Sequence, residues 1–305
     1  MLISIITPVL NEEDSVENFA FEIDKTFSSL LHDYELLFID DGSIDLTVER
    51  IVKLKEKYPS IRLVKLSRNF GKEIALSAGI DYAHGDAVIP MDVDLQDPPY
   101  LIPEMIKTYE TGFDVVLARR IERNTDSLIK KFTAIAFYKI IKKLSTTPIP
   151  ENVGDFRMIS RKVVDSLKKM KETQRFMKGL FSWPGYRTAY VDYVRPLRSA
   201  GNTKFNGKKL FALAIEGITG FSYLPLKIWT FIGITVSFVA FIYASFIVIR
   251  TIIFGVVLPG YASTLVAVLF LGGIQLIGFG FLGEYIGRIY MEVKQRPLYL
   301  VDEEY

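Results

Sequence analysis

The sequence contains no cysteine and only two histidines, His32 and His84, in 305 residues. The absence of cysteine excludes disulfide bonds, thiolate catalysis and zinc sites built on thiolates. Two histidines are also too few for a histidine metal cluster. A metal ion in this protein would therefore be held mainly by oxygen ligands, and this favours Mg²⁺ or Mn²⁺.

Strong charge of one sign and a phosphate-binding P-loop are also missing. The formal net charge is +2 and the basic residues form no continuous run, so a nucleic-acid partner is not expected. Without a P-loop, a kinase or NTPase function loses its usual sequence support. The first residues, MLISIITPVLNEE, lack the basic segment and unbroken apolar run of a signal peptide, so we expect the soluble part to start in the cytoplasm.

Short apolar, β-branched runs alternate with amphipathic segments in the first part of the chain. This alternation predicts an α/β fold with βαβ units around a mostly parallel sheet. The expected strands are Ile3–Thr7, Glu35–Ile39, Arg62–Leu66, Ala87–Met91 and Asp114–Leu117. Polar clusters follow these strands, and in an open α/β sheet such clusters meet at the carboxyl ends of the strands. We therefore expect one common site.

The strongest cluster is Asp92-Val93-Asp94-Leu95-Gln96-Asp97-Pro98-Pro99. Two carboxylates one residue apart after a buried strand can bind a hard divalent cation, whose open positions then take diphosphate oxygens. A turn that merely contains two aspartates is the structural alternative. The second acidic cluster, Asp40-Asp41-Gly42-Ser43, favours the metal interpretation because it follows a neighbouring strand.

Three other strand ends add candidate donor contacts. Asp40 and Asp41 favour nucleotide binding, with Asp41 accepting hydrogen bonds from a base or ribose. Glu12 follows the first strand, where a nucleobase could lie, although acids at a helix start also interact well with the helix dipole. The loop that ends in Lys72 carries positive charge suited to phosphate oxygens or to orienting the carboxylates.

Two uncharged apolar segments, Trp229–Ile249 and Ala262–Gly283, each have about the ~20 residues that cross a bilayer. The second is rich in glycine, which suits close packing with the first or with another subunit in a homo-oligomer. Basic residues flank the pair, and only Arg250 lies between the spans. The positive-inside rule then places both termini and the catalytic domain in the cytoplasm and predicts a multi-pass protein of the inner (plasma) membrane.

Three further segments are amphipathic and basic: residues 127–144, 175–183 and 208–221. Such helices tend to lie in the headgroup region of a bilayer. For the first two segments, packing into the core with one solvated face is the alternative. The expected organisation is a catalytic domain over residues 1–205, a juxtamembrane segment over 206–228, two spans over 229–288 and a cytoplasmic tail over 289–305.

The motif set resembles family 2 glycosyltransferases of the dolichol-phosphate mannose synthase type. The resemblance rests on Pro8-Val9-Leu10-Asn11-Glu12, Asp40-Asp41-Gly42-Ser43, Arg68-Asn69-Phe70-Gly71-Lys72 and the cluster that begins at Asp92. The later motifs Gly154-Asp155-Phe156-Arg157, Gly201-Asn202-Thr203-Lys204-Phe205 and Gly283-Glu284-Tyr285-Ile286-Gly287-Arg288 are similar to those of the two-span bactoprenol glucosyltransferases. The likeness covers essentially the whole chain. It implies a nucleotide-sugar-binding sheet of the glycosyltransferase A type and an inverting transfer.

The resemblance also implies roles for individual residues. Pro8, Glu12 and Asp41 would hold the uridine or guanosine, and Asp92, Asp94 and Gln96 the metal and diphosphate. Arg119, Arg198 and Lys204 would bind phosphates, although Asn202-Thr203-Lys204 stands where the mannose synthases usually carry Glu-Ser-Lys. The remaining candidate donor contacts are Asn11, Asp40, Lys72 and Val93. The candidate acceptor-phosphate contacts are Arg119, Arg120, Lys130 and Lys131.

The expected chemistry follows from charge. A departing nucleoside diphosphate gains negative charge, which a divalent metal with Arg198 or Lys204 can stabilise. The acceptor phosphate is mostly ionised at neutral pH because its second pKa is about 6, so a strong general base is unnecessary. Asp94, Arg119 and Asp155 are the candidate catalytic residues. Asp155 would orient the acceptor or accept its last proton, or would simply pair with Arg157 or a neighbouring arginine.

The most specific expectation is transfer of a hexose, glucose from UDP-glucose, to a polyprenyl phosphate such as undecaprenyl or dolichol phosphate. A processive polysaccharide synthase is one alternative, since it shares the acidic clusters and Gln174-Arg175-Phe176 is similar to part of its motif. Two spans make a poor polymer channel, however. A non-catalytic membrane adaptor is the other alternative, but an adaptor has no need for acids on successive strand ends.

Overall fold

The computed structural model describes residues 1–121, 150, 152–173, 175–194, 224–255 and 260–305. The chain divides into two compact units. The first combines Met1–Gly220 with Arg296–Tyr305, and the second is Phe221–Gln295. The expected amphipathic segments 127–144 and 208–221 lie outside the described residues.

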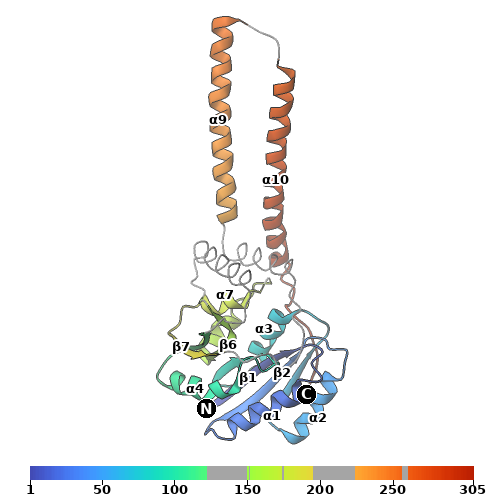
Figure 1. The fold of residues 1–305 in the computed structure, drawn as a ribbon. Helices are drawn as coiled ribbons and strands as arrows, with labels where there is room; N and C mark the ends of the chain where they lie inside the picture. The colour runs from blue at the N-terminus through green and yellow to red at the C-terminus, as the bar shows by residue number, and fades with distance from the viewer. Residues whose placement is uncertain (122–149, 151, 174, 195–223, 256–259) are drawn as a thin grey trace. The chain divides into compact units, whose positions relative to one another are not determined.

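A mixed eight-stranded sheet with the order β7-β5-β6-β4-β1-β2-β3-β8 forms the centre of the first unit (Figure 1). Its strands are β1 (Leu2–Val9), β2 (Asp33–Asp40), β3 (Ile61–Leu66), β4 (Ala87–Pro90), β5 (Val115–Arg120), β6 (Val153–Ser160), β7 (Thr188–Tyr193) and β8 (Val301–Glu304). All five expected strands are confirmed within a few residues. Neighbours β4, β1, β2 and β3 pair in parallel, whereas β6 and β8 are antiparallel to their neighbours.

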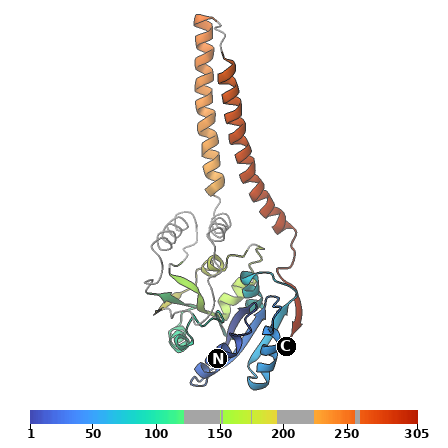
Figure 2. The same ribbon diagram turned by 45° about the vertical axis from the view of Figure 1, so that its right-hand side comes forward.

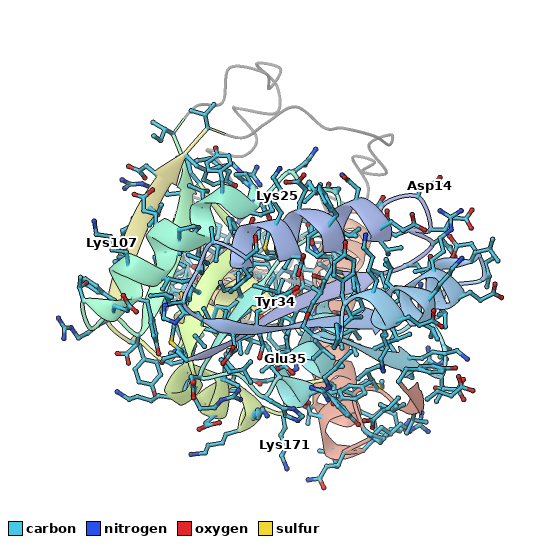
Figure 3. All side chains as sticks on the ribbon, turned by 90° about the horizontal axis from the view of Figure 1, so that it is seen from below. Asp14, Lys25, Tyr34, Glu35, Lys107 and Lys171 are labelled. Atoms are coloured by element: carbon cyan, nitrogen blue, oxygen red, sulfur yellow. The ribbon has the colours of Figure 1, made fainter. Side chains whose placement is uncertain are left out.

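Helices cover both faces of this sheet. They are α1 (Val16–Phe27), α2 (Thr47–Lys57), α3 (Lys72–Tyr82), the 3-10 helix η1 (Pro99–Leu101), α4 (Ile102–Glu110), α6 (Arg161–Lys168) and α7 (Met177–Ser182). Helices α1, α2 and α4 lie on one face and α3 on the other (Figures 1 and 3). The fully buried Phe19 of α1 packs edge-on against Phe38 of β2. On the opposite face, Gly79 of α3 lets the helix approach Ile6 and Ile39 closely.

Helix α7 corrects one expectation. The sequence favoured an interfacial helix over residues 175–183, but Met177, Leu180 and Phe181 are buried within the first unit. The core-packing alternative is therefore right for these residues, and only Trp183 at the helix end is largely exposed. Amphipathic composition alone did not distinguish a membrane surface from a protein core, because both favour the same apolar face.

The second unit contains two long helices, α9 (Leu224–Phe254) and α10 (Tyr261–Val293). Their apolar stretches, Phe231–Phe254 and Phe270–Val293, are long enough to cross a membrane. The Trp229 ring lies 5.6 Å from that of Phe281, and a Cβ on Gly278 would overlap the Trp229 indole. One glycine of α10 thus permits helix packing as expected. Packing against another subunit stays a prediction.

The last residues of the chain return to the first unit, which the sequence analysis did not predict. Strand β8 pairs antiparallel with β3 at the edge of the sheet (Figure 2). Lys65 lies 2.8 Å from Asp302, and the Tyr299 hydroxyl donates to Asp81 of α3 at 2.9 Å. One folded unit therefore contains chain from both before and after the two long helices.

Glu35 stabilises the amino-terminal end of the sheet, below helix α1 (Figure 3). Its buried carboxylate accepts hydrogen bonds from the Ser4 hydroxyl, from the His84 amide at 2.6 Å and from Arg62 at 2.9 Å. Burial raises the pKa of Glu35, but these three donors outweigh it and the pKa lies below the ordinary value. The ionised form is therefore the one that the fold favours.

We expect Glu35→Gln to lower the free energy of unfolding by about 1–3 kcal/mol at neutral pH, because Arg62 loses its counter-charge. The stability that comes from the lowered pKa is present above the unfolded-state pKa of about 4.3 and is lost as pH falls through the folded-state pKa. Denaturant unfolding across acidic and neutral pH measures both effects. Glu22→Gln, which removes a surface pair with Lys25, is the control; an equal loss there would contradict the assignment.

Candidate functional site

The carboxyl ends of β1, β2 and β4 border a cavity of about 270 Å³. It is lined by Pro8, Val9, Leu10, Glu12, Asp41, Lys72, Asp92, Val93 and Asp94. The expected convergence of the strand-end clusters on one site is thus observed. Among the other predicted site residues, Lys130, Lys131, Arg198 and Lys204 lie outside the described residues.

Asp41 connects the end of β2 to the loop before α3. Its two carboxylate oxygens accept hydrogen bonds from the backbone N–H groups of Phe70 at 2.7 Å and Gly71 at 2.9 Å. Burial raises the pKa of Asp41, and the two backbone donors only partly offset that effect. Asp41 therefore fixes the loop that delivers Lys72, while its side chain also faces the cavity.

Asn11 and Asp40 hold the loops around the cavity and do not line it. Asn11 adopts a left-handed backbone (φ 53°), and its side-chain oxygen accepts a hydrogen bond from the Ile44 N–H at 2.9 Å. Asp40 is fully buried and accepts the Ser43 N–H at 3.2 Å. Burial raises the pKa of Asp40 despite those bonds. Direct donor binding by these two residues stays a prediction.

Glu12 lines the cavity, as expected, and also begins the chain turn before α1. Its backbone N–H donates to the Thr47 hydroxyl at 2.9 Å, and its carboxylate accepts from Ser15 at 2.9 Å. The Ser15 bond leaves the rest of the carboxylate with acceptor capacity. Both interpretations of Glu12, as part of a helix start and as a cavity residue, are therefore compatible with the observed geometry.

Asp92 and Asp94 follow β4 and both face the cavity. The turn is tight, because Leu95 has a φ of 53° and the Gln96 N–H donates to the Asp94 carboxylate at 3.1 Å. Among the described residues, no group of three or more His, Cys, Asp and Glu side chains could hold a metal. Two carboxylates nevertheless fit Mg²⁺, which proteins often hold through one or two carboxylates together with substrate phosphates and water. The donor set therefore suits a hard cation that binds with a phosphorylated ligand.

Lys72, the first residue of α3, bridges two acidic residues. Its ammonium nitrogen lies 2.6 Å and 2.8 Å from the two Asp92 oxygens and 3.2 Å from Asp155. Partial burial lowers the pKa of Lys72, but Asp92 and Asp155 outweigh it and the pKa lies above the ordinary value. The ammonium is therefore charged at any physiological pH. The sequence pattern predicts Lys72 near phosphate or carboxylate groups, but not its pairing with Asp155.

Asp155 of β6 is mostly buried, and its Oδ1 atom has no hydrogen-bond partner among the described residues. Burial raises the pKa of Asp155, but Lys72 and then Arg157 outweigh it, so the pKa is lowered. The Arg157 guanidinium donates to the Gly154 carbonyl at 2.6 Å and lies over the Phe181 ring. Burial lowers the pKa of Arg157 to about 10. The carboxylate of Asp155 thus forms its ion pair with Lys72.

Arg119 and Arg120 lie at the end of β5 and do not line the cavity. Arg119 makes a two-pronged pair with Asp192 of β7, at 2.6 Å and 2.9 Å. Arg120 donates to the Tyr193 hydroxyl, which in turn donates to the buried Asp97 at 3.0 Å. Asp192 and Tyr193 were not among the predicted site residues, because their only signal is the register of β5 against β7. The acceptor-phosphate roles of both arginines stay predictions.

Comparison with known proteins identifies the chain's relatives. The sequence profile of glycosyl transferase family 2 matches residues 4–168. A prophage bactoprenol glucosyl transferase homolog of Escherichia coli K12 is 52% identical over 302 residues, which cover 99% of this chain and 98% of the relative. The bactoprenol glucosyl transferase of Shigella phage SfII is 50% identical over 306 residues, covering 100% and 99%. These alignments extend through the two long helices.

The fold has a counterpart among solved structures. A mannosyl-3-phosphoglycerate synthase from Rubrobacter xylanophilus superposes with a TM-score of 0.50 and 16% identity, covering 72% of each chain. Likeness at this level of identity concerns the fold alone. The expected glycosyltransferase A type of sheet is confirmed.

We expect Gly42→Ala to weaken binding of UDP, the nucleotide expected from the sequence, by about tenfold or more. Gly42 has a φ of 82°, and a Cβ there would lie 2.7 Å from the Asn69 nitrogen and 2.8 Å from the Arg68 carbonyl carbon. The loop held by Asp41 would have to move. Isothermal titration of the purified protein with UDP measures the effect.

Gly112→Ala is the matched control, since Gly112 has a φ of 96° with nothing within 4 Å of its Cβ position. The control imposes the same backbone strain without the steric overlap. Equal UDP affinity in the two variants would show that the contact with residues 68 and 69 does not support the site.

Proposed function

This chain belongs to glycosyl transferase family 2, and on that premise we propose that it transfers glucose from UDP-glucose to the phosphate of a polyprenyl phosphate. The observation that carries the proposal is the cavity at the strand ends, where Asp41, Asp92 and Asp94 converge in a chain about half identical to bactoprenol glucosyl transferases. Bactoprenol phosphate, which is undecaprenyl phosphate, is the proposed lipid acceptor.

The donor occupies the cavity in this proposal. Pro8 supplies rigid backbone, Glu12 and Asp41 accept hydrogen bonds from the base and ribose, and Val93 packs beside them. Lys72 and Asp92 lie at the diphosphate. Asn11 and Asp40 support these contacts through the loops that they fix. Arg198 and Lys204, outside the described residues, complete the proposed donor set.

Mg²⁺ or Mn²⁺ is the proposed cofactor, with Asp92, Asp94 and Gln96 as its protein contacts. Bound there, such an ion neutralises the negative charge that gathers on a departing diphosphate. The protein's own contribution is to keep the Asp92 and Asp94 carboxylates aimed at one cavity, through the tight turn at Leu95. A prepositioned charge of this kind costs no rearrangement when the bond breaks.

The acceptor is a phosphate and is already anionic, so catalysis depends on its placement more than on a strong base. Asp155 is proposed to orient the acceptor or to take its last proton, and its Oδ1 atom, which has no hydrogen-bond partner in the part of the chain that the structure describes, supports that role. Arg119 and Arg120 are proposed to attract the lipid phosphate, together with Lys130 and Lys131. Attack from the side opposite the diphosphate would invert the anomeric carbon.

A membrane position is supported by the two long apolar helices and by β8. A folded sheet cannot lie on both sides of a bilayer, and the first unit contains chain from both before and after these helices. If the helices cross a bilayer, both must therefore cross. We propose the inner membrane, with the catalytic unit and both termini cytoplasmic, since the basic residues flank the helix pair.

The proposal is tested by incubating full-length protein with polyprenyl phosphate and a panel of radiolabelled nucleotide-sugars. We expect UDP-glucose to be preferred and a single hexose to be added to each lipid. A ladder of lengthening saccharides would instead favour a processive synthase, and no product with any donor would favour an adaptor.

Asp94→Asn is expected to lower the transfer rate by about a hundredfold or more, since it removes one charge from the proposed metal site. Asp165→Asn, at an exposed position on α6, makes the same chemical change away from the cavity and should leave the rate near that of the wild type. The same assay with Mg²⁺ or Mn²⁺ measures both variants. Full activity of Asp94→Asn would refute the metal assignment.

Arg119→Met is expected to raise the KM for polyprenyl phosphate by about tenfold, with the KM for UDP-glucose unchanged, because the arginine is proposed to contact the acceptor alone. Arg187→Met is the control, since Arg187 is exposed and lies over the Phe113 ring. A rise in the donor KM with Arg119→Met would contradict the acceptor assignment.

A further inference from the structure

The Lys72 ammonium group occupies the two carboxylate oxygens of Asp92, which a metal ion could otherwise use. Both oxygens of Asp92 lie within 2.8 Å of its ammonium nitrogen, and Asp92 is one of the two carboxylates that face the cavity from the end of β4. A hard divalent cation prefers the same oxygens at about 2.0–2.2 Å. An ammonium and a divalent cation on one carboxylate repel each other, so the two compete for Asp92.

Lys72 also has a second place to bind. Its nitrogen is already 3.2 Å from Asp155, whose other oxygen, Oδ1, is buried without a hydrogen-bond partner among the described residues. The lysine side chain is 48% exposed and carries its ammonium group on a flexible four-carbon stem, so a small rotation can move the charge from Asp92 to Asp155. The charge would then stay beside the cavity after leaving Asp92.

We propose that Lys72 is an internal cation that occupies Asp92 and must move to Asp155 before a divalent metal binds there. The proposal rests on the assignment of Asp92 and Asp94 as metal contacts. Lys72 is in this sense a positioning residue: it makes the metal bind weakly to the protein alone. Binding becomes tight when a nucleoside diphosphate supplies negative charge for both cations.

Arg157 and Lys178, two other cations near this site among the described residues, do not share the arrangement. The Arg157 guanidinium donates to the backbone carbonyls of Gly154 and Asp155. Lys178 acts on Asp155 and Glu73 through its charge, and among the described residues it makes no hydrogen bond or ion pair with Asp92. Removing Lys72 or Lys178 therefore deletes the same charge from the same region, but only the first substitution frees the Asp92 oxygens.

The test measures Mn²⁺ binding to full-length protein in detergent, through the electron paramagnetic resonance signal of free Mn²⁺. Without nucleotide, we expect Lys72→Met to bind Mn²⁺ about tenfold more tightly than wild type, a usual size for coupling between two ligands. Lys178→Met should bind Mn²⁺ about as wild type does. Lys72→Gln provides a second neutral side chain, and circular dichroism confirms the fold of each variant.

Titration with UDP present supplies a second readout. Wild-type protein should gain Mn²⁺ affinity on adding UDP, and that gain should be several-fold smaller in Lys72→Met, because the competing cation is already gone. A transfer assay cannot provide this comparison, since Lys72 is itself a proposed donor contact.

Unchanged or weaker Mn²⁺ binding by both Lys72 variants would overturn the inference. So would an equal gain in Lys178→Met, since a general charge effect would then explain the result. The inference about Lys72 can fail while the metal assignment holds. This is the case if wild-type protein binds Mn²⁺ and Asp94→Asn does not. If wild type binds no Mn²⁺ with or without UDP, the metal assignment and the inference fail together.

Discussion

Parallel hydrogen bonding between β4, β1, β2 and β3 makes four strands end at the same edge of the sheet. Val9 is opposite Asp40 in this register, so the loops that follow β1 and β2 start side by side. Every cavity residue comes from β1 or from a segment that follows one of these strands. The mostly apolar buried positions of these strands thereby hold the carboxylates that follow them close to one another.

The acidic residues at this edge divide into two groups. Asp40 and Asp97 are buried, and their oxygens accept hydrogen bonds from the surrounding loops and strands. Asp92 and Asp94 face the cavity, where Lys72 contacts both Asp92 oxygens. Asp40 and Asp97 hold the loops in place. Because the loops are held, the side chains of Asp92 and Asp94 stay directed at the cavity. Lys72 forms the shortest ion pair among the described residues of the site, with Asp92, and so compensates negative charge on the pair Asp92 and Asp94.

Local patterns predicted the features that depend on local sequence. The period of apolar residues gave the five expected strands, and the polar residues after them gave most of the cavity lining. Non-local contacts were not predictable in this way. The pairing of Lys72 with Asp155 and of Arg119 with Asp192 depends on sheet order, which one sequence does not reveal. The prediction of a membrane-surface position for helix α7 was wrong, because its amphipathic composition suits a membrane surface and a protein core equally.

Strand β8 has a consequence for biosynthesis. It is made from the last residues of the chain, so the edge of β3 has no partner until translation has passed both apolar helices. An unpaired strand edge invites association with other chains during that interval. If the two helices cross a bilayer, as proposed, the sheet is completed only after both have inserted, and a chain whose second helix did not return to the starting side would keep an unpaired β3 edge. Under that proposal, pairing of β8 with β3 depends on correct insertion of both helices.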